Sequence, residues 1–345
     1  MGEWKDLVIK WRRLTKWELV HVPLYRTASR AKLLKTLLCS YCSNDCKYCM
    51  FRRNRLSTPR KIWDREKLVN IAIELWKTGV IDGVFITSAL FKDPDTTVEM
   101  ELEVVEELRR RGFKGYIHLR LMPGTSRSLL IRAVEIADRA GINIEAPTRY
   151  EFEDIAPDKG DWYRDIINKL SYMAQIAKHR NALRAGVDTQ VIVGFGDDTD
   201  LEHLKIAEML FRMGVRRVYF SPFIPIKDTP LENKAPAPKW RCYRLFQAAE
   251  LIRNYGFRVK ELEDILVKDM LPNKDPKELY AEVNKEFFPV DLTTATYNEL
   301  IRVPGIGPRT AKKILKLRNE HKLNKESLLR ILGRRYRKAI KYITF

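Results

Sequence analysis

The sequence predicts an α/β fold with a parallel sheet, followed by a small all-helical domain near the C-terminus. Short apolar segments recur along the chain, and amphipathic segments with helical spacing lie between them. Chains that alternate in this way form parallel strands joined by right-handed helical crossovers. A glycine-containing turn between two short helical segments, near residue 305, indicates the separate helical domain.

The elements are expected in this order. Residues 4–17 place apolar side chains at helical spacing between Lys and Arg, which predicts an amphipathic helix that packs on the parent domain rather than on a membrane. Six strands are expected at 35–41, 83–88, 116–122, 142–146, 189–194 and 217–221. Helices are expected at 64–77, 98–111, 127–139, 163–179 and 201–213.

Length and composition indicate a protein with a sizeable core. The chain has 345 residues, of which 45% are hydrophobic, enough for one large domain and a small one. No apolar run approaches the roughly 20 residues of a membrane span, and the first residues do not resemble a signal peptide. We therefore expect a cytoplasmic protein. Its five cysteines, an odd number, do not indicate a disulfide framework.

Three cysteines follow the first predicted strand at C-x3-C-x2-C spacing: Cys42, Cys46 and Cys49. Thiolates are the ligands that iron–sulfur clusters and zinc require. Cubane clusters usually take four cysteines, so three leave one iron open to another ligand. Cys39 would complete four thiols for a structural zinc site, the alternative. The gap between the cysteine pairs is short for zinc, and Cys39 also suits a buried position in the strand.

This spacing, with Tyr48 directly before the last cysteine, resembles the cluster loop of the radical S-adenosylmethionine (radical SAM) enzymes. The resemblance implies a partial (β/α)6 radical SAM barrel, in agreement with the six predicted strand–helix units. It implies a 4Fe-4S cluster on Cys42, Cys46 and Cys49, with S-adenosylmethionine bound at the open iron and Tyr48 near the adenine. It also implies reductive formation of a 5′-deoxyadenosyl radical, with electrons from a protein such as a ferredoxin or flavodoxin.

Polar residues end the second and third predicted strands, at the edge where parallel sheets collect their functional groups. Thr87 and Ser88 stand where many radical SAM enzymes have a Gly-Gly-Glu-like motif, from which this chain departs. Arg120 is expected either to pair with a ligand carboxylate or phosphate or to form a salt bridge at the rim. We expect all three residues near the cofactor.

The fourth and fifth predicted strands supply further candidates. Asn143 and Glu145 are two positions apart and therefore share one face of a strand. The pair is similar to the Asn-x-Asp of biotin-synthase-like members, which holds ribose hydroxyls. Ile192 matches the apolar contact of the family's adenine wall. Thr189 and Gln190 beside it can equally be ordinary strand residues.

The tail resembles a helix-hairpin-helix module of DNA repair and replication proteins. Residues 303–308 form a predicted turn between helices at 297–302 and 310–318. Glycines let backbone N–H groups approach a phosphate, and the second helix presents its positive N-terminus there. A plain turn in a protein-binding helical pair is the alternative. The resemblance implies that nucleic acid is bound by Gly305, Gly307, Arg309, Thr310, Lys312 and Lys313.

The charge distribution supports a polyanionic partner. The net charge is +19, and residues 296–345 contain 14 Lys and Arg against 3 Glu, which accounts for 11 of these charges. A second basic group follows the cysteine loop. Solvated charge is its simplest interpretation, and a phosphate contact is the alternative; it comprises Arg52, Arg53, Arg55, Arg60 and Lys61.

The predicted domain organisation follows from these assignments. The Pro-containing segment 232–239 marks a boundary. A helix near 240–255 and a strand near 257–267 are expected to cap the open barrel. The domains are an N-terminal amphipathic extension at 1–32, the partial barrel at 33–232, a barrel-capping extension and connector at 233–288, and the helix-hairpin-helix nucleic-acid-binding domain at 289–345.

A closer family resemblance covers nearly the whole chain from about residue 33. Its segments are 116–124, 143–148, 156–159 and 288–291 running into 303–307. They are similar to radical SAM proteins of DNA modification or repair whose family name records a link to a uracil-DNA-glycosylase-like partner. The resemblance implies such a partner but no substrate nucleotide.

The sequence therefore predicts a radical SAM enzyme that acts on nucleic acid, in DNA modification or repair. A base buried in duplex would first have to be flipped out. An RNA-modifying enzyme, acting on tRNA, is the alternative. A non-catalytic nucleic-acid-binding protein with a structural metal is the alternative from another class. No residue is assigned to catalysis.

Overall fold

The computed structural model describes residues 24–26 and 31–345, so the helix expected at 4–17 lies outside the described residues. None of the described helices combines the length and the apolar character that a bilayer crossing requires. The chain divides into two compact units. The first comprises the described residues up to Phe195 with Arg212–Pro236, and the second comprises Gly196–Phe211 with Ala237–Phe345.

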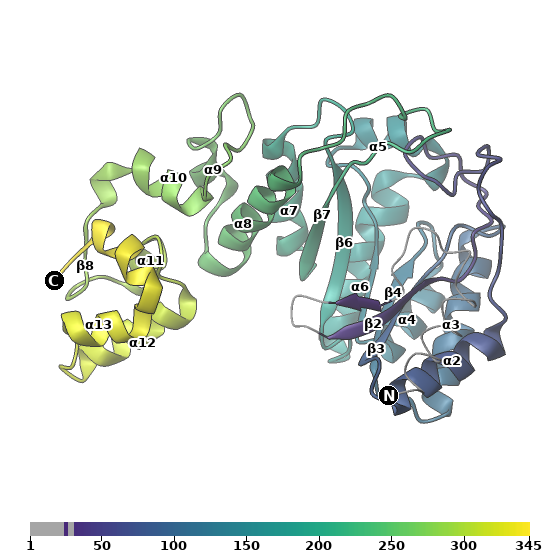
Figure 1. The fold of residues 1–345 in the computed structure, drawn as a ribbon, viewed down its shortest axis with the longest axis horizontal. Coiled ribbons are helices and arrows are strands. Elements are labelled where there is room, and N and C mark those ends of the chain that lie inside the picture. The colour runs from purple at the N-terminus through teal and green to yellow at the C-terminus, as the bar shows by residue number, and fades with distance from the viewer. Residues whose placement is uncertain (1–23, 27–30) are drawn as a thin grey trace, which may run out of the picture. The chain divides into compact units, whose positions relative to one another are not determined.

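A sheet of seven described strands forms the centre of the first unit (Figure 1). The strands lie in chain order, so each crossover joins neighbours. β1 pairs antiparallel with β2, and β2 to β7 are parallel, which confirms the six predicted parallel strands. The strands are β1 (Leu24–Arg26), β2 (Lys32–Leu37), β3 (Gly83–Thr87), β4 (Tyr116–Leu121), β5 (Arg139–Ile142), β6 (Gly186–Val193) and β7 (Arg217–Pro222).

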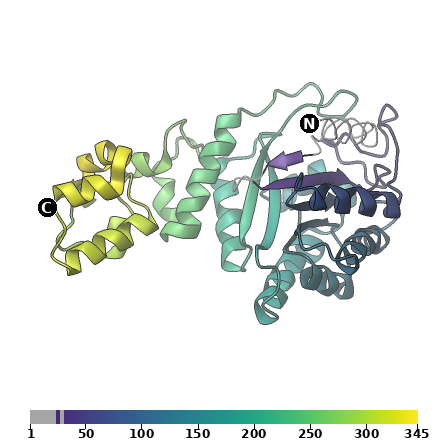
Figure 2. The ribbon, with the colours of Figure 1, turned by 60° about the horizontal axis from the view of Figure 1, so that its bottom comes forward.

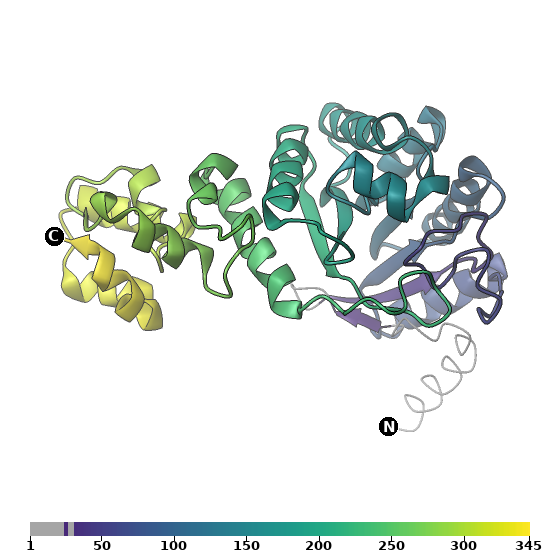
Figure 3. The same ribbon diagram turned by 90° about the horizontal axis from the view of Figure 1, so that it is seen from above.

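Helices α2, α3, α4 and α6 pack side by side along the outer face of this sheet, which curls into a half-barrel (Figure 3). The fold is therefore the expected partial barrel with helices on its outside. The helical segments of this unit are α2 (Arg65–Lys77), α3 (Pro94–Arg110), α4 (Arg127–Ile136), α5 (Arg149–Ile155), the 3-10 turn η1 (Pro157–Lys159), the π-helical turn η2 (Trp162–Ile167) and α6 (Asn168–His179).

The two faces of the sheet differ in chemistry. In β4, Ile117 and Leu119 are fully buried, whereas Tyr116, His118 and Arg120 line a cavity. Successive side chains of a strand point to opposite faces, so the apolar set packs on the helices and the polar set lies on the concave face. The concave side of the half-barrel is consequently polar and charged.

The boundaries of the fourth strand differ from the prediction. The strand expected at 142–146 is observed at Arg139–Ile142. Asn143 and Glu145 therefore lie beyond the strand end, and their predicted placement on one strand face is wrong. Glu145 instead forms an isolated bridge with Val191.

The strand expected near 257–267 is also wrong. The short helix α9 (Val259–Glu263) lies there, followed by an isolated antiparallel β-bridge between Val267 and Met270. The buried residues Val259 and Leu262 are three positions apart, a spacing that suits one helical face. A short apolar run does not distinguish helix from strand by itself.

The second unit is helical apart from one short strand pair (Figure 2). Its core around the hairpin includes Leu300, Val303, Ile306 and Ile314. The short strands β8 (Val290–Asp291) and β9 (Ile343–Thr344) pair in parallel and so join the segment before the hairpin to the last helical turns. The helices are α7 (Asp200–Arg212), α8 (Lys239–Tyr255), α9, α10 (Pro276–Val283), η3 (Lys285–Phe287), α11 (Tyr297–Leu300), α12 (Pro308–Asn319), α13 (Lys325–Leu332), η4 (Gly333–Arg335), α14 (Tyr336–Ala339) and η5 (Ile340–Tyr342).

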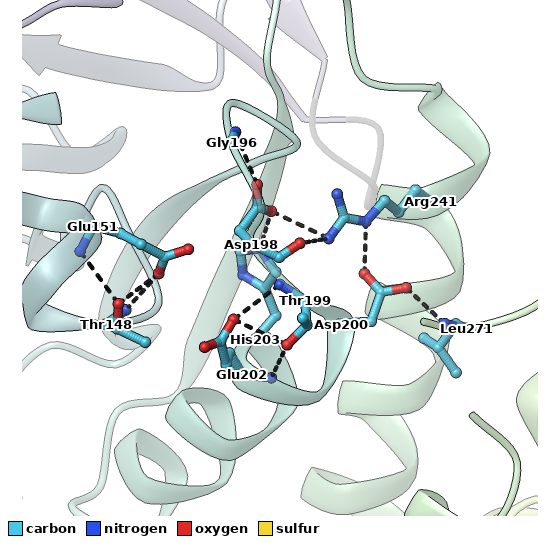
Figure 4. A network of polar contacts seen from close by, with 10 residues as sticks. All are labelled: Thr148, Glu151, Gly196, Asp198, Thr199, Asp200, Glu202, His203, Arg241 and Leu271. Atoms are coloured by element: carbon cyan, nitrogen blue, oxygen red, sulfur yellow. Dashed lines mark hydrogen bonds and ion pairs between the residues drawn. The ribbon is translucent and has the colours of Figure 1, made fainter. Parts of the chain in front are cut away.

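A buried polar network joins α7 to α8 within the second unit (Figure 4). The Arg241 guanidinium from α8 lies 2.7 Å from a carboxylate oxygen of Asp200 and 3.1 Å from one of Asp198. Asp198 also lies 2.8 Å from His203, and Asp200 accepts the Leu271 N–H at 2.8 Å. Because buried charges are costly unless they are paired, this network holds the start of α8 against the start of α7.

Candidate functional site

The loop that follows β2 brings the three predicted cysteines, Cys42, Cys46 and Cys49, to one cavity. Asp45 organises this loop. Its carboxylate accepts from Arg52 Nε at 2.8 Å and from the Asn54 N–H at 3.1 Å. The hydrogen bond from Arg52 lowers the pKa of Asp45 below its ordinary value. The cysteines are therefore presented by a loop that is closed on an internal ion pair.

The basic residues after the cysteines brace the same loop. Arg60 donates to the carbonyl oxygens of Phe51 at 2.8 Å and Arg52 at 2.6 Å. Arg55 donates to the Lys227 carbonyl at 2.9 Å, and Arg53 donates to Ser43 O at 3.0 Å. These bonds give the group a structural role, which neither the solvated nor the phosphate-binding interpretation of the sequence anticipated.

Three thiols that line one cavity fit the ligand set of an iron–sulfur cluster. Burial raises the pKa of Cys46 to about 12 and that of Cys49 to about 11. Such thiols become thiolates beside strong positive charge, which ligated iron supplies. In the described part of the chain, no three His, Cys, Asp or Glu side chains lie close enough to share a single metal ion. Cys39 is fully buried and does not line the cavity, which disfavours the zinc alternative.

Glu145 and Lys159 form a buried ion pair in this cavity. Lys159 Nζ lies 2.5 Å from Glu145 Oε1 and 3.3 Å from the Tyr48 hydroxyl. The Glu145 carboxylate raises the pKa of Lys159 despite its burial. Glu145 has a φ of +62°, a left-handed conformation that is uncommon for residues other than glycine and that concentrates at functional sites.

The predicted cofactor residues meet in one place with two exceptions. Tyr48 and Ile192 are not among the residues that line the cavity. Tyr48 is nevertheless linked to it through Lys159, and the Ile192 N–H donates to the Glu145 carbonyl at 2.8 Å. The cavity is lined by Thr87, Ser88, Arg120, Asn143 and Glu145 together with the three cysteines.

Arg120 forms a salt bridge, one of the two expectations for it, although the bridge is buried rather than at the rim. Its Nη1 lies 3.0 Å from Asp188 Oδ1, and its Nη2 donates to Asp188 Oδ2 at 3.1 Å. Asp188 is fully buried, and Arg120 and His118 hold its pKa well below the usual range although burial opposes this. Asp188 was not identified from the sequence, although a carboxylate inside an apolar strand was a usable signal.

Lys159 was also not identified as a site residue. The segment 156–159 carried the family resemblance, but its spacing gives no indication of a contact with Glu145. The segment also positions the cysteine loop, because Asp158 accepts the Asp45 N–H at 2.8 Å.

The predicted hairpin of the second unit lies between α11 and α12. Gly305 has a φ of +89°, and a Cβ there would lie 3.1 Å from the Arg335 carbonyl, so the turn requires glycine. A Cβ on Gly307 would lie 3.1 Å from the Tyr255 hydroxyl. Lys277 Nζ donates to Ile306 O at 2.5 Å. Both glycines open on a cavity of about 420 Å³ that also contains Arg335.

The remaining predicted nucleic-acid ligands divide by exposure. Arg309, Lys312 and Lys313 are exposed on α12. Thr310 is 5% exposed and packs inside the second unit, unlike the other three.

Comparison with known proteins identifies the family. The model of the radical SAM superfamily matches residues 36–210, just over half of the chain. The chain therefore belongs to the radical SAM superfamily, whose enzymes use a 4Fe-4S cluster and S-adenosylmethionine. A helix-hairpin-helix motif matches residues 285–331.

Two curated relatives are biotin synthases. That of Hydrogenobaculum sp. is 27% identical over 229 residues, which is 64% of this chain and 62% of the relative. That of Acetivibrio thermocellus is 27% identical over 202 residues, 56% of this chain and 57% of the relative. The chain thus matches about three fifths of their length. The crystal structure of HydG, a FeFe-hydrogenase maturase, superposes with a TM-score of 0.50 at 13% identity, over 88% of this chain and 81% of that chain, which supports the fold.

Proposed function

We propose that this radical SAM enzyme modifies a nucleic acid, with DNA favoured over RNA. The observation that carries the proposal is the presence, in one chain, of a radical SAM domain and a basic helix-hairpin-helix motif. Residues 296–345, which include most of the motif, hold 11 of the 19 net positive charges. A DNA-repair role and a uracil-DNA-glycosylase-like partner rest on the sequence resemblance.

Cys42, Cys46 and Cys49 would ligate the cluster. When bound, the cluster and S-adenosylmethionine supply a 5′-deoxyadenosyl radical that abstracts a hydrogen atom from substrate. Asp45 and Arg60 hold the cysteine loop closed around the ligands. The protein's own contribution is thus to position the thiols and to keep them from solvent.

Asn143 and Glu145 would contact S-adenosylmethionine, since both line the cavity that contains the cysteines. Lys159 orients Glu145 through the ion pair. Thr87 and Ser88 lie on the β3 side of the same cavity. Tyr48 and Ile192 act indirectly in this proposal, through Lys159 and through the backbone of Glu145.

The hairpin would hold a phosphate of the nucleic acid. The N–H groups of Gly305 and Gly307, at the N-terminus of α12, are suited to an anion. The exposed Arg309, Lys312 and Lys313 add positive charge on the same helix. Such contacts fix the position of the nucleic acid without reading its sequence.

The test is formation of 5′-deoxyadenosine by the anaerobically reconstituted, reduced protein, with duplex DNA, single-stranded DNA, tRNA or no polymer. We expect one of the DNA forms to stimulate product formation. Stimulation by tRNA alone would replace DNA by RNA in the proposal. Equal formation with and without every polymer would refute a nucleic-acid substrate.

The ligand assignment is tested separately by iron content. Cys46→Ala should abolish cluster assembly, whereas Cys39→Ala, a matched change outside the cavity, should retain iron and the visible absorption of the cluster. Full iron stoichiometry in Cys46→Ala would refute the assignment.

A further inference from the structure

The concave face of the half-barrel encloses a second cavity, of about 580 Å³, within the range of small-molecule sites. Strand register explains its chemistry. Arg120, Gly141, Asp188 and Arg217 are partners on one rung of the parallel ladder. Because side chains on one rung of a sheet face the same side, the polar side chains of β4, β6 and β7 converge here, across a glycine of β5.

The cavity is strongly cationic. The described residues that line it include Lys35, Arg120, Arg139 and Arg217 and contain no carboxylate. Asp188 lies behind them and pairs with Arg120. Like charges held together away from water repel one another, and burial together with Arg120 lowers the pKa of Lys35. An anion in the cavity would relieve this repulsion.

Arg139 carries the most direct sign of a missing ligand. Its Nε donates to the Tyr116 hydroxyl at 3.0 Å. Its Nη1 is buried without a hydrogen-bond partner in the described chain, and it lies 4.0 Å from Asp188 Oδ2. Buried donors in folded proteins are almost always satisfied, and Arg139 lines the cavity, so its guanidinium has hydrogen-bonding capacity left for an acceptor there.

Aromatic rings complete the wall. The Phe85 ring stacks on His118 with centroids 4.0 Å apart and planes at 10°. Tyr116 and Tyr219 line the same cavity. Burial lowers the pKa of His118, although Asp188 at 3.0 Å opposes this. Cationic groups beside aromatic faces suit a nucleotide, which combines a phosphate with a planar base.

The two cavities of this unit meet at Arg120. Among the described residues, it is the one that lines both the cysteine cavity and the concave-face cavity. A molecule held on the concave face would therefore lie next to the site of the cofactors. This placement suits a substrate rather than a remote effector.

We propose that the concave-face cavity binds a phosphate of a nucleotide unit of the substrate, and that Arg139 contacts this phosphate, with Lys35 and Arg217 adding positive charge. The inference rests on the proposed function and narrows its substrate to a phosphate-bearing nucleotide. The same chemistry could come from a free mononucleotide or from a nucleotide within a strand.

The experiment measures binding to the full, anaerobically reconstituted chain in the presence of saturating S-adenosylmethionine. The probes are each 2′-deoxynucleoside 5′-monophosphate, the matching nucleoside without phosphate, and a short single-stranded oligonucleotide, by isothermal titration calorimetry. We expect at least one monophosphate to bind about tenfold or more tightly than its nucleoside. Arg139→Gln should remove this preference, since one charge-assisted hydrogen bond is worth about this factor.

The matched control is Arg132→Gln, an arginine of α4 that pairs with Glu99 and Glu106 outside the cavity. It should keep the preference. If Arg139→Gln does not fold, by circular dichroism, Lys35→Met is judged by the same criterion. A parallel loss for the oligonucleotide identifies a strand as the source of the phosphate, and a loss confined to monophosphate identifies a free nucleotide.

Two outcomes would overturn the inference: equal affinity of nucleoside and monophosphate for the wild-type protein, or an intact preference in the cavity variants. The two proposals fail separately. Arg139-dependent phosphate binding with polymer-independent 5′-deoxyadenosine formation would refute only the nucleic-acid substrate. Polymer-stimulated 5′-deoxyadenosine formation without Arg139-dependent phosphate binding would refute only the phosphate site in the concave-face cavity.

Discussion

Glu145 combines a left-handed backbone with a nearly fully buried carboxylate, and Lys159 is the residue that neutralises it. The 3-10 turn η1 (Pro157–Lys159) places Lys159 against Glu145, which lies three residues beyond the end of β5. A strained conformation of this kind persists only where the surrounding structure holds it in place. The ion pair thus supports the geometry of the candidate cofactor site.

Removal of Lys159 should therefore destabilise the protein. Lys159→Met leaves a buried carboxylate without its partner, and we expect a loss of about 3–5 kcal/mol in the free energy of unfolding. Urea denaturation of the variant measures this. The double variant Glu145→Gln with Lys159→Met should recover much of the loss, and an equal loss in both would contradict the ion-pair explanation.

Lys277 should make stability depend on pH. Burial lowers its pKa from 10.5 to about 7. Between these values the unfolded chain binds more protons than the folded chain, so the free energy of unfolding rises with pH, by about 1.4 kcal/mol per pH unit at most. Comparing denaturation at pH 7.5 and 9.5, the wild-type protein should gain stability relative to Lys277→Met. Parallel pH profiles would show that Lys277 keeps its ordinary pKa.

At the scale of elements, β5 is limited to a glycine where β4 and β6 approach it. A Cβ on Gly141 would lie 1.8 Å from the Asp188 carbonyl and 2.7 Å from Arg120 Nη1. The ion pair between β4 and β6 thus passes over β5 only because this position has no side chain. One residue of β5 thereby decides whether the concave face can be assembled.

Gly141→Ala should destabilise the half-barrel by about 1–3 kcal/mol or more, since backbone must move to admit the methyl group. The matched control is Gly196→Ala, where an added Cβ meets no atom within 4 Å and φ is ordinary. The control should stay within about 0.5 kcal/mol of the wild-type protein in thermal or urea denaturation. Similar stability of the two variants would show that the sheet accommodates a methyl group at position 141 without strain.

The link between α7 and α8 depends on Arg241. Arg241→Met would leave Asp198 and Asp200 buried without their shared cation, and we expect a loss of about 3–5 kcal/mol. Hydrogen exchange should become faster in α7 and α8. Exposed Arg212→Met at the end of α7 is not a matched control, because Arg212 has contacts of its own. The better comparison is Arg244, whose side chain donates to Asn273 on the surface. Arg244→Met should change the free energy of unfolding little.

At the scale of the whole molecule, the excess positive charge should appear as salt-dependent nucleic-acid binding. Each neutralised phosphate changes the slope of log affinity against log salt by about 0.9. Replacing the exposed pair Lys312 and Lys313 by alanine should reduce the slope by roughly 2 for duplex DNA. The same change at exposed Lys77 and Lys178, on helices of the half-barrel, should leave the slope unchanged. Equal slopes for both double variants would exclude α12 from the interface.

Much of the fold could be predicted because its signals are local. Alternating strand and helix periodicity predicted six parallel strands, and the cysteine spacing predicted one loop that presents three thiols. The short antiparallel β1 was missed. The fourth strand was placed three to four residues too late, since Ile144 and Ala146 continue the apolar alternation beyond Ile142, where the ladder with β4 ends.

The sequence by itself determined the superfamily, the cofactors and the thiols that line one cavity, because these are written in residue types at fixed spacings. The tertiary structure decided which distant residues meet. It paired Arg120 with Asp188 and Glu145 with Lys159. It also placed the Arg60 guanidinium where it donates to the Phe51 carbonyl of the same loop. Such contacts depend on strand register and on loop closure over long separations, and burial then selects the partner that each charge requires.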